Sequence, residues 1–413
     1  MSKMALIVQK FGGTSVANIE RIKHAAKLVA AERKKNNQVI VVVSAMSGVT
    51  EQLIGYAREV SDLVDPNQLA EYDSIISSGE QVTSGLLALE LQSLGFKSRS
   101  FLGWQAGIKT NKAYAKSRIE RIDADIFHEA LAADYIPVLA GFQGIDPDNR
   151  ISTMGRGGSD TSAVAVAAAL KAERCDIYTD VTGVYTADPR IVPKATQLAK
   201  VSYDEIMEMA SLGAKVLQIR AVEMAAKHQV KVQVLSSFTE SPGSLIVSNE
   251  EIMEQRLITA VAHSKNEAKV TLKNVKNTPG VVAEIFKPLG AANINIDMII
   301  QNISPDEKTA TVTFTMKDTE LAAALNALNN AVDQQVFNCD DISSAKNLAK
   351  VSVIGIGMQD HPGTAQKVFQ VMAEQDVNII NITTSEIKIS VLINESDIET
   401  TVKALHSAFD LDN

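Results

Sequence analysis

Five residues in the C-terminal part of the chain recur at one constant spacing. Each member of the first set returns 83 residues later: Pro279, Gly280, Phe286, Asn295 and Ile296 recur as Pro362, Gly363, Phe369, Asn378 and Ile379. Each copy reads as a strand (Lys269 to Val275; Lys350 to Ile356), a Pro-Gly turn, an amphipathic helix, a strand beginning at Asn-Ile, a hairpin to a third strand, and a final helix. The repeat therefore predicts two ferredoxin-like βαββαβ domains.

The repeat sets the domain boundaries. We expect the two domains over residues 264–345 and 346–413, with a longer hairpin through Ser304 to Lys308 in the first. The segment Ile258 to His263 precedes both copies, and we expect residues 257–263 to add a strand to the second.

Ahead of the repeat, residues 1–248 alternate strand-like and helical stretches, which is typical of a mostly parallel α/β sheet with helices on both faces. The strands are expected at Ala5 to Val8, Val39 to Val43, Ser98 to Leu102, Ile136 to Ala140, Asp176 to Thr179 and Lys231 to Leu235. The helices are expected at Ile19 to Lys34, Gly79 to Leu94, Thr161 to Lys171 and Tyr203 to Leu212.

Composition excludes several classes of protein. A net charge of -9 without a basic stripe argues against nucleic-acid binding. The uncharged stretch Asn36 to Thr50 is too short to span a membrane, and the N-terminus lacks a secretion signal, so we expect a cytoplasmic protein without a membrane partner. The two cysteines, Cys175 and Cys339, form no pair with metal-site or disulfide-framework spacing.

The first strand runs directly into a glycine turn. Lys10, Gly12 and Gly13 offer a cation and a bare backbone to a phosphate, and Thr14 and Ser15 are suited to cap the next helix. A plain strand-to-helix turn would have the same glycines.

Two further segments follow predicted elements. Ser44 to Thr50 comes after the strand Val39 to Val43, where open α/β sheets bind ligands, although a simple Ser/Gly loop reads the same way. Glu80 opens an apolar helix, where it can compensate the helix dipole or hold a substrate ammonium.

The most specific segment is Thr153 to Ser162. Three glycines surround Arg156, whose planar guanidinium suits a carboxylate, and Asp160 at the following helix start can orient nearby lysines. The polar loop from Thr179 to Arg190 suits a nucleotide, and Lys215 is a second candidate phosphate cation. The chain has no GxxxxGK[ST] loop and no protein-kinase motif set, yet phosphoryl transfer still fits because it depends mainly on positioned donors and cations.

These motifs together resemble the aspartate kinases of the amino acid kinase family. The resemblance rests on Lys10 to Val16, Val43 to Thr50, Ser78 to Glu80, Gly155 to Thr161 and Thr179 to Arg190, and the C-terminal repeat is similar to the paired ACT domains of these enzymes. It implies ATP-dependent phosphorylation of L-aspartate to 4-phospho-L-aspartate, the entry to lysine, threonine and methionine biosynthesis.

The resemblance also implies residue roles. Lys10, Asp160 and Lys215 would be catalytic, with Asp160 holding both lysines and with Gly12 and Gly13 donating backbone N–H groups. The aspartate site would comprise Ser44, Thr50, Glu80, Arg156, Gly157, Gly158 and Ser159. The ATP site would comprise Lys10, Gly12, Gly13, Thr14, Ser15, Thr179, Asp180, Gly183, Val184, Tyr185, Asp188, Arg190 and Lys215. Mg2+ would travel on ATP, and no protein ligand is named for it.

In the ACT pair, feedback amino acids, lysine or threonine, would bind at the helix starts. Thr278 and Pro279 are expected as N-cap and first helical residue, with Gly280 leaving the helix end open. The effector candidates are Thr278, Gly280, Asn295, Asp297, Met298, Asn378, Thr384, Ser385 and Glu386. We expect a homo-oligomer or an assembly of two unequal chains, with Met253 as a possible internal start of the smaller one.

Two other readings remain open from the sequence. A sister enzyme of the same fold would phosphorylate glutamate, acetylglutamate or a nucleotide. A non-catalytic amino-acid sensor would keep the ACT pair and lose turnover.

Overall fold

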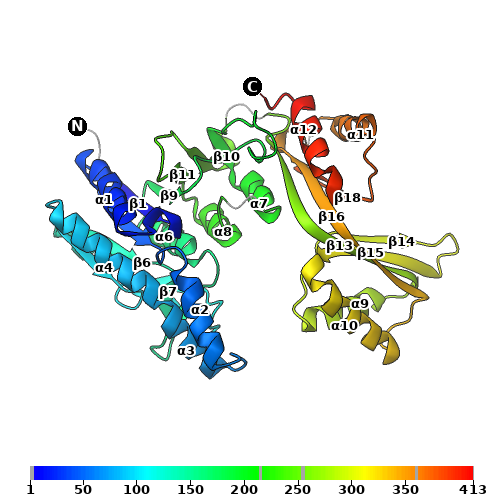
Figure 1. Ribbon diagram of the computed structural model, residues 1–413, viewed down its shortest axis with the longest axis horizontal. Helices are drawn as coiled ribbons and strands as arrows, with labels where there is room; N and C mark the ends of the chain where they lie inside the picture. The colour runs from blue at the N-terminus through cyan, green and yellow to red at the C-terminus, as the bar shows by residue number, and fades with distance from the viewer. Residues whose placement is uncertain (1–3, 214–215, 253–255, 359–360, 413) are drawn as a thin grey trace. The chain divides into compact units, whose positions relative to one another are not determined.

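The computed structural model describes residues 4–213, 216–252, 256–358 and 361–412, and these fall into two compact units (Figure 1). The first unit comprises residues 1–185 and 197–254, and the second comprises residues 186–196 and 255–413. In the described part of the chain, no helix has both the length and the apolar character needed to cross a membrane.

An eight-stranded sheet organises the first unit, in the order β10-β12-β11-β9-β1-β2-β6-β3. Neighbours are parallel except for β11 and β12. The strands are β1 (Leu6–Phe11), β2 (Gln38–Val43), β3 (Ser98–Phe101), β6 (Ile136–Ala140), β9 (Arg174–Thr179), β10 (Lys200–Ser202), β11 (Val232–Ser236) and β12 (Ser244–Val247). A smaller sheet in the order β5-β4-β7-β8 contains β4 (Ile108–Thr110), β5 (Ile119–Ile122), β7 (Gln143–Ile145) and β8 (Ile151–Thr153).

Helices cover both faces of the large sheet. On one face, α1 (Ile19–Lys34) and α4 (Ser78–Ser93) form a core with Val39, Val41 and Val43 of β2. The fully apolar run of β2 is explained by this two-sided burial, since α6 (Gly158–Ala169) contacts β1, β2 and β9. The remaining helices of this unit are α2 (Val49–Val60), α3 (Pro66–Ile76), α5 (Asp125–Ala132), α7 (Tyr203–Ser211) and α8 (Ile219–His228).

Two predicted boundaries are wrong in a way that affects the site. β1 continues past Val8 to Phe11, because Gln9, Lys10 and Phe11 pair with both β2 and β9. α6 begins at Gly158 instead of Thr161, because Gly157 adopts a left-handed conformation (φ 71°) that starts the helix three residues earlier. Lys10 is therefore a strand residue, and Asp160 lies in the first turn of α6.

The second unit contains one continuous antiparallel sheet in the order β14-β15-β13-β16-β18-β17. Its strands are β13 (Ala260–Lys276), β14 (Ile299–Ile303), β15 (Thr309–Lys317), β16 (Asp341–Ile354), β17 (Asn381–Ser385) and β18 (Lys388–Asn394), and its helices are α9 (Val281–Ala291), α10 (Leu321–Asp333), α11 (Thr364–Glu374) and α12 (Ile398–Ala408). The long strands β13 and β16 each serve both ferredoxin-like domains: residues 260–264 pair with residues 350–354, and residues 269–273 pair with residues 341–345.

Each ferredoxin-like domain has its own apolar core. The first packs β13, α9, β15 and α10, and the second packs β16, α11, β18 and α12. The second core also includes Ala187, Ile191 and Val192, which explains why residues 186–196 belong to this unit. The strands predicted to begin at Asn295 and Asn378 begin later, at Ile299 and Asn381, where regular pairing with β15 and β18 starts.

Candidate functional site

The carboxyl edge of the large sheet carries a buried ion pair. Lys10 projects from β1 toward α6, and its Nζ lies 2.5 Å from Oδ1 of Asp160. Both side chains are mostly buried, so the charge of each group is compensated by the other with little help from water. A fixed ammonium at the carboxyl end of a parallel strand is well placed to meet a phosphoryl group.

The glycine turn after β1 is tightly packed. A Cβ added at Gly13 would lie 3.1 Å from the carbonyl oxygen of Ala45, so glycine lets the turn approach the loop after β2. The structure corrects the predicted role of Gly12, whose N–H already donates to the carbonyl oxygen of Tyr178 at 3.1 Å. Gly13 remains the candidate backbone donor of this turn.

Thr14 and Ser15 do not cap a helix. They lie in a short 3-10 turn (Gly13–Val16), and α1 is capped by Asn18, whose side chain accepts from Arg21 N. Ser15 is fully buried, and its hydroxyl binds Tyr178 O and Ser237 Oγ, so it is a packing residue instead of a nucleotide contact. Thr14 is exposed.

Glu80 lies in the first turn of α4, and its side chain is only 3% exposed. Burial raises the pKa of its carboxyl group to about 7, although backbone hydrogen bonds from Ala45 and from Glu80 itself and the charge of Lys10 act in the opposite direction. Its Oε2 is buried, and no hydrogen-bond partner for it is found among the described residues. A buried carboxylate oxygen with an unused acceptor suits an incoming ammonium group.

The loop after β2 borders Glu80. A Cβ added at Gly79 would lie 2.7 Å from Cβ of Ala45, so the start of α4 packs directly on the Ser44–Ala45 turn. Ser44 is half-buried with its N–H bonded to Phe11 O, and Thr50 lies half-buried in the first turn of α2. The two hydroxyl residues predicted for the substrate site thus flank the same turn.

Residues 154–157, which we call the arginine loop, connect β8 to α6. The side chain of Arg156 is exposed, and no hydrogen bond or ion pair of its guanidinium is seen among the described residues. Gly155 and Gly157 both have positive φ (74° and 71°), so the loop needs glycine on either side of the arginine. Gly158 and Ser159 follow as buried residues of α6.

The predicted nucleotide loop is divided between the two units. Thr179, Asp180, Gly183 and Tyr185 belong to the first unit, in which Thr179 Oγ1 donates to Asp180 and Tyr185 bonds Thr182. Val184 is completely buried, with its N–H donating to Ser244 Oγ, so its side chain belongs to the core.

Asp188 and Arg190 belong to the second unit, in which they form an ion pair with each other at 2.7 Å. The hydrogen bond from Arg190 lowers the pKa of Asp188. Lys215 and Met253, both singled out in the sequence, lie outside the described residues.

The start of α9 differs from its prediction. Gly280, with φ 96°, is the residue that precedes the helix, and no side chain caps it, so Thr278 is not the N-cap and Pro279 is not the first helical residue. The reason is that the Pro-Gly pair forms its own turn and the helix begins at Val281. Gly363 (φ 100°) precedes α11 in the same way.

The effector candidates of the second copy lie around a cavity of about 570 Å3. Thr384, Ser385 and Glu386 line it from the end of β17, and Gly363 and Thr364 line it from the start of α11. Asn378 is exposed before β17.

In the first copy, Asn295 is exposed and Asp297 forms an ion pair with the buried Lys350. Met298 is buried against Leu348 and Leu392, and its N–H donates to Thr315 Oγ1, so its side chain belongs to an apolar core. The two copies therefore differ. The second has an open cavity at its effector candidates, whereas in the first the acidic candidate, Asp297, is already ion-paired with Lys350.

Two residues near the arginine loop belong to no sequence motif, and the sequence analysis does not identify them as functional candidates. Asp73 is buried in α3, and Arg220 in α8 binds the carbonyl oxygen of Met154. A signal for Asp73 is its spacing, since Ala70, Asp73 and Ile76 form the buried stripe of α3. Among the described residues, no three His, Cys, Asp or Glu side chains are grouped as metal ligands.

Comparison with known proteins adds independent evidence. A model of the amino acid kinase family matches residues 5–236, and ACT domain models match residues 270–333 and 351–409. An aspartate kinase of Stutzerimonas stutzeri is 48% identical over 410 residues, covering 99% of this chain and 98% of that protein. An aspartokinase of Pseudomonas aeruginosa is 48% identical over 411 residues, again with 99% and 98% coverage.

Solved structures agree with the sequence relatives. E. coli aspartokinase III in complex with aspartate and ADP has a TM-score of 0.77 and 27% identity, covering 98% of this chain and 99% of that one. The same enzyme in complex with lysine and aspartate has a TM-score of 0.78 and 26% identity, with the same coverage. The predicted fold, a mostly parallel α/β sheet followed by two ferredoxin-like domains, is confirmed.

Proposed function

The chain belongs to the aspartate kinases of the amino acid kinase family, and from this premise we propose how its residues divide between ATP and L-aspartate. The observation that carries the assignment is the buried Glu80, whose Oε2 has no hydrogen-bond partner within residues 4–213, 216–252, 256–358 and 361–412. Glu80 accepts from the ammonium of L-aspartate, and Arg156 pairs with its α-carboxylate. Ser44, Thr50 and Ser159 complete this substrate site, with Gly157 and Gly158 providing close backbone approach.

The reaction needs no activated side chain. An oxygen of the aspartate β-carboxylate, already ionised at neutral pH, attacks the γ-phosphorus of ATP. The new P–O bond forms while the bond from that phosphorus to the bridging oxygen of ADP breaks, which gives 4-phospho-L-aspartate and ADP.

Lys10 stabilises the negative charge of the transferring phosphoryl group, and Asp160 fixes its ammonium at 2.5 Å. Gly13 donates its N–H to the same group, and Thr179, Asp180 and Tyr185 contact the nucleotide. Lys215 keeps its predicted role as a second phosphate cation. The donor set of the site favours Mg2+ arriving on the ATP phosphates, since the nearest described carboxylate to Lys10, that of Asp160, is already ion-paired.

The enzyme assignment is tested by the choice of acceptor. We expect ADP release with L-aspartate, followed by a coupled assay, and little release with L-glutamate, N-acetyl-L-glutamate or a nucleoside monophosphate. A preference for any of those acceptors, or the absence of one for L-aspartate, would contradict the substrate assignment. A product of this type enters lysine, threonine and methionine biosynthesis.

Regulation is assigned to the second ferredoxin-like domain. An end-product amino acid, lysine or threonine, binds the cavity of about 570 Å3 with its carboxylate at the start of α11 and its ammonium toward Thr384, Ser385 and Glu386. The support is the open cavity in this copy together with the lysine-bound structure of E. coli aspartokinase III.

The regulatory assignment is tested by titration. Lysine and threonine are added singly and together to the same ADP-release assay, and one of them is expected to inhibit. Ser385→Tyr, which fills the cavity, should weaken inhibition and leave the uninhibited kcat unchanged. Inhibition that is equally strong in Ser385→Tyr would exclude this cavity as the effector site.

A further inference from the structure

Asp73 of α3 is a buried carboxylate held by neutral donors. Its side chain is 0% exposed, and no ion pair to it is seen in the described ranges. Oδ2 accepts from Thr153 N at 2.7 Å, Oδ1 accepts from Thr153 Oγ1 at 2.6 Å, and both oxygens lie 3.0 Å from Ala115 N. Burial raises its pKa to about 6, while these hydrogen bonds lower it. Such a group is costly to bury, so its three donors must be held in place.

Arg220 of α8 binds two main-chain carbonyl groups. Its Nη1 donates to Met154 O at 2.6 Å, and its Nη2 donates to Ser117 O at 3.0 Å. Burial lowers the pKa of this guanidinium. A planar fork that spans two carbonyl oxygens fixes their separation and orientation.

Both side chains join the same two segments of the chain. One segment contains Ala115 and Ser117, and the other contains Thr153, the last residue of β8, and Met154, the first residue of the arginine loop. The segments are also bonded directly, because Ser117 N donates to Thr153 O at 2.9 Å. The main chain that enters the arginine loop is therefore tied at consecutive residues from two different helices.

The arginine loop packs closely against these neighbouring segments. A Cβ added at Gly155 would lie 2.9 Å from Ala115 O, and one at Gly157 would lie 1.9 Å from the side chain of Gln218, next to α8. A displacement of either segment would therefore be transmitted to the residue between the two glycines, Arg156.

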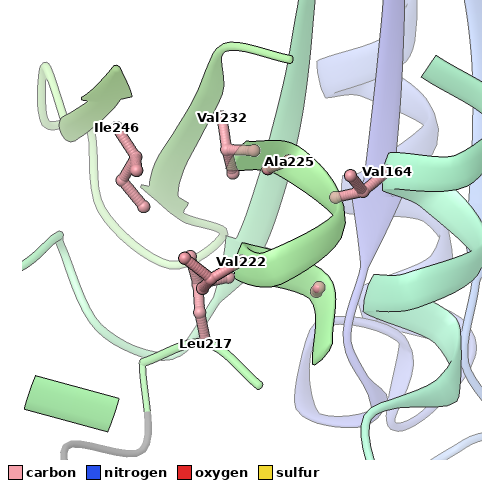
Figure 2. Close-up of a pocket in the computed structure, with 7 residues that line it drawn as sticks. Val164, Leu217, Val222, Ala225, Val232 and Ile246 are labelled. Atoms are coloured by element: carbon pink, nitrogen blue, oxygen red, sulfur yellow. The ribbon is translucent and has the colours of Figure 1, made fainter. Parts of the chain in front are cut away.

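α8, which carries Arg220, packs through apolar side chains on its neighbours. Val222 and Ala225 of α8, Val164 of α6 and Val232 of β11 are among the residues that line an apolar gap, and Figure 2 shows Val222 on the side of the helix near Leu217. The gap has no room for a water molecule, so the helix is held by direct apolar contact. Arg220 is the second residue of α8 and the one arginine in that helix, and it precedes this contact face.

We propose that Asp73 and Arg220 are positioning residues that hold the arginine loop so that Arg156 meets the α-carboxylate of L-aspartate. The inference rests on the proposed function, in which Arg156 binds that carboxylate. Neither positioning residue touches the substrate. Because a misplacement of about 1 Å can cost about 100-fold in a positioned reaction, loosening either residue should act strongly on the aspartate site.

The test separates the aspartate site from the ATP site. In Asp73→Asn, the amide N–H2 replaces one acceptor facing the N–H groups, and we expect the KM for L-aspartate to rise about tenfold or more while the KM for ATP stays within about twofold. Arg220→Gln should show the same split. Thr153→Val removes one donor to Asp73 and should raise the aspartate KM less, and Thr153→Ser should restore it.

The matched control is Glu32→Gln. Glu32 is another buried carboxylate, bonded to Lys35 and Asn37 near the end of α1, and α1 ends at the opposite edge of the sheet because β2 begins just after it. Hydrogen exchange gives a readout independent of activity: the amides of Ala115 and Thr153 should exchange faster in Asp73→Asn than in Glu32→Gln.

The outcomes are distinguishable. If exchange at Thr153 accelerates in Asp73→Asn but the aspartate KM stays within about twofold, Asp73 is only structural and the proposal fails. Equal rises in Asp73→Asn and Glu32→Gln would also overturn it. If Arg156→Lys itself leaves the aspartate KM unchanged, the proposed function fails first, because Arg156 then does not bind the substrate.

Discussion

Glu80→Gln should make the protein more stable and a poorer enzyme at the same pH. In the free protein, burial raises the pKa of Glu80 from 4.5 to about 7. The folded state therefore favours the protonated carboxyl group. The ionised form is destabilised until a substrate ammonium reaches Oε2, the buried oxygen that has no hydrogen-bond partner among the residues described. Glutamine has the shape of the protonated form but cannot supply the charge.

The magnitudes follow from the shift. A change from 4.5 to about 7 corresponds to about 3 kcal/mol, at about 1.4 kcal/mol per pKa unit. Because the folded-state pKa is raised, this contribution to stability is present below pH 4.5 and is lost as the pH rises through 7. Glu80→Gln should therefore gain up to about 3 kcal/mol of unfolding free energy relative to wild type at pH 8, and about none at pH 4.

Activity should move in the opposite direction. With a pKa of about 7, Glu80 is about one tenth ionised at pH 6 and about nine tenths ionised at pH 8, so kcat/KM for L-aspartate should rise about tenfold across that range. In Glu80→Gln this rise should disappear, and the KM for L-aspartate should be about 10- to 100-fold higher because a charge-assisted hydrogen bond is lost.

The assay pairs urea unfolding with steady-state kinetics at several pH values, for wild type and Glu80→Gln. Taking the difference between the two proteins removes the contribution of other titrating groups, including Asp73 with its pKa of about 6. The reasoning is refuted if both proteins show the same pH dependence of kcat/KM, or if Glu80→Gln is the less stable protein at pH 8.

Three further predictions concern single side chains. Lys10→Ala should lower kcat about 100- to 1,000-fold in the ADP-release assay, since one positioned charge donor is lost; unchanged activity would contradict its catalytic role. Gly79→Ala should cost about 1–3 kcal/mol in urea unfolding because its Cβ would lie 2.7 Å from Cβ of Ala45, whereas Gly85→Ala in the same helix, with open space around it, should gain about 0.5–1 kcal/mol. His406 is fully buried, and its ring nitrogens contact Thr186 Oγ1 and Asp412 Oδ1. Burial lowers the pKa of its imidazole below 6.5. Its contribution to stability is therefore present above pH 6.5 and is lost as the pH falls through the folded-state pKa. His406→Gln should flatten that loss in thermal melts between pH 5 and 7, and an unchanged slope would exclude this origin.

Features that depend on spacing could be predicted from the sequence. The 83-residue repeat predicts two ferredoxin-like domains, and the observed strand order confirms them. The apolar run of β2 is visible because a strand buried on both faces has few polar positions. The motif around Arg156 is visible because three glycines around one arginine are an unusual local pattern, whereas the close contacts of Gly155 with Ala115 and of Gly157 with Gln218 become apparent only in the fold.

Features that depend on tertiary partners could not be predicted. Ser15 looks like an open hydroxyl in the sequence, yet Tyr178 and Ser237, distant in the chain, bury it. The sequence predicts Met298 as an effector contact, but in the fold Met298 is buried together with Leu348 and Leu392. Thr278 has the chemistry of an N-cap, but Gly280 takes the left-handed conformation first and the helix starts after it.

Three buried carboxylates around the proposed aspartate site show how environment divides one chemical group among three tasks. Asp160 faces Lys10 at 2.5 Å, so its charge serves to hold a cation. Asp73 faces three neutral donors, so it can fix the main chain but cannot bind a second charge without losing them. Glu80 keeps a buried oxygen with neither a hydrogen bond nor an ion pair in the part of the chain that the structure describes, whereas Asp160 Oδ1 is ion-paired with Lys10, so of the three Glu80 is the carboxylate suited to an incoming ammonium. Exchanging an acid for its amide should therefore act on phosphoryl transfer at Asp160, on loop geometry at Asp73 and on the pH dependence of aspartate binding at Glu80.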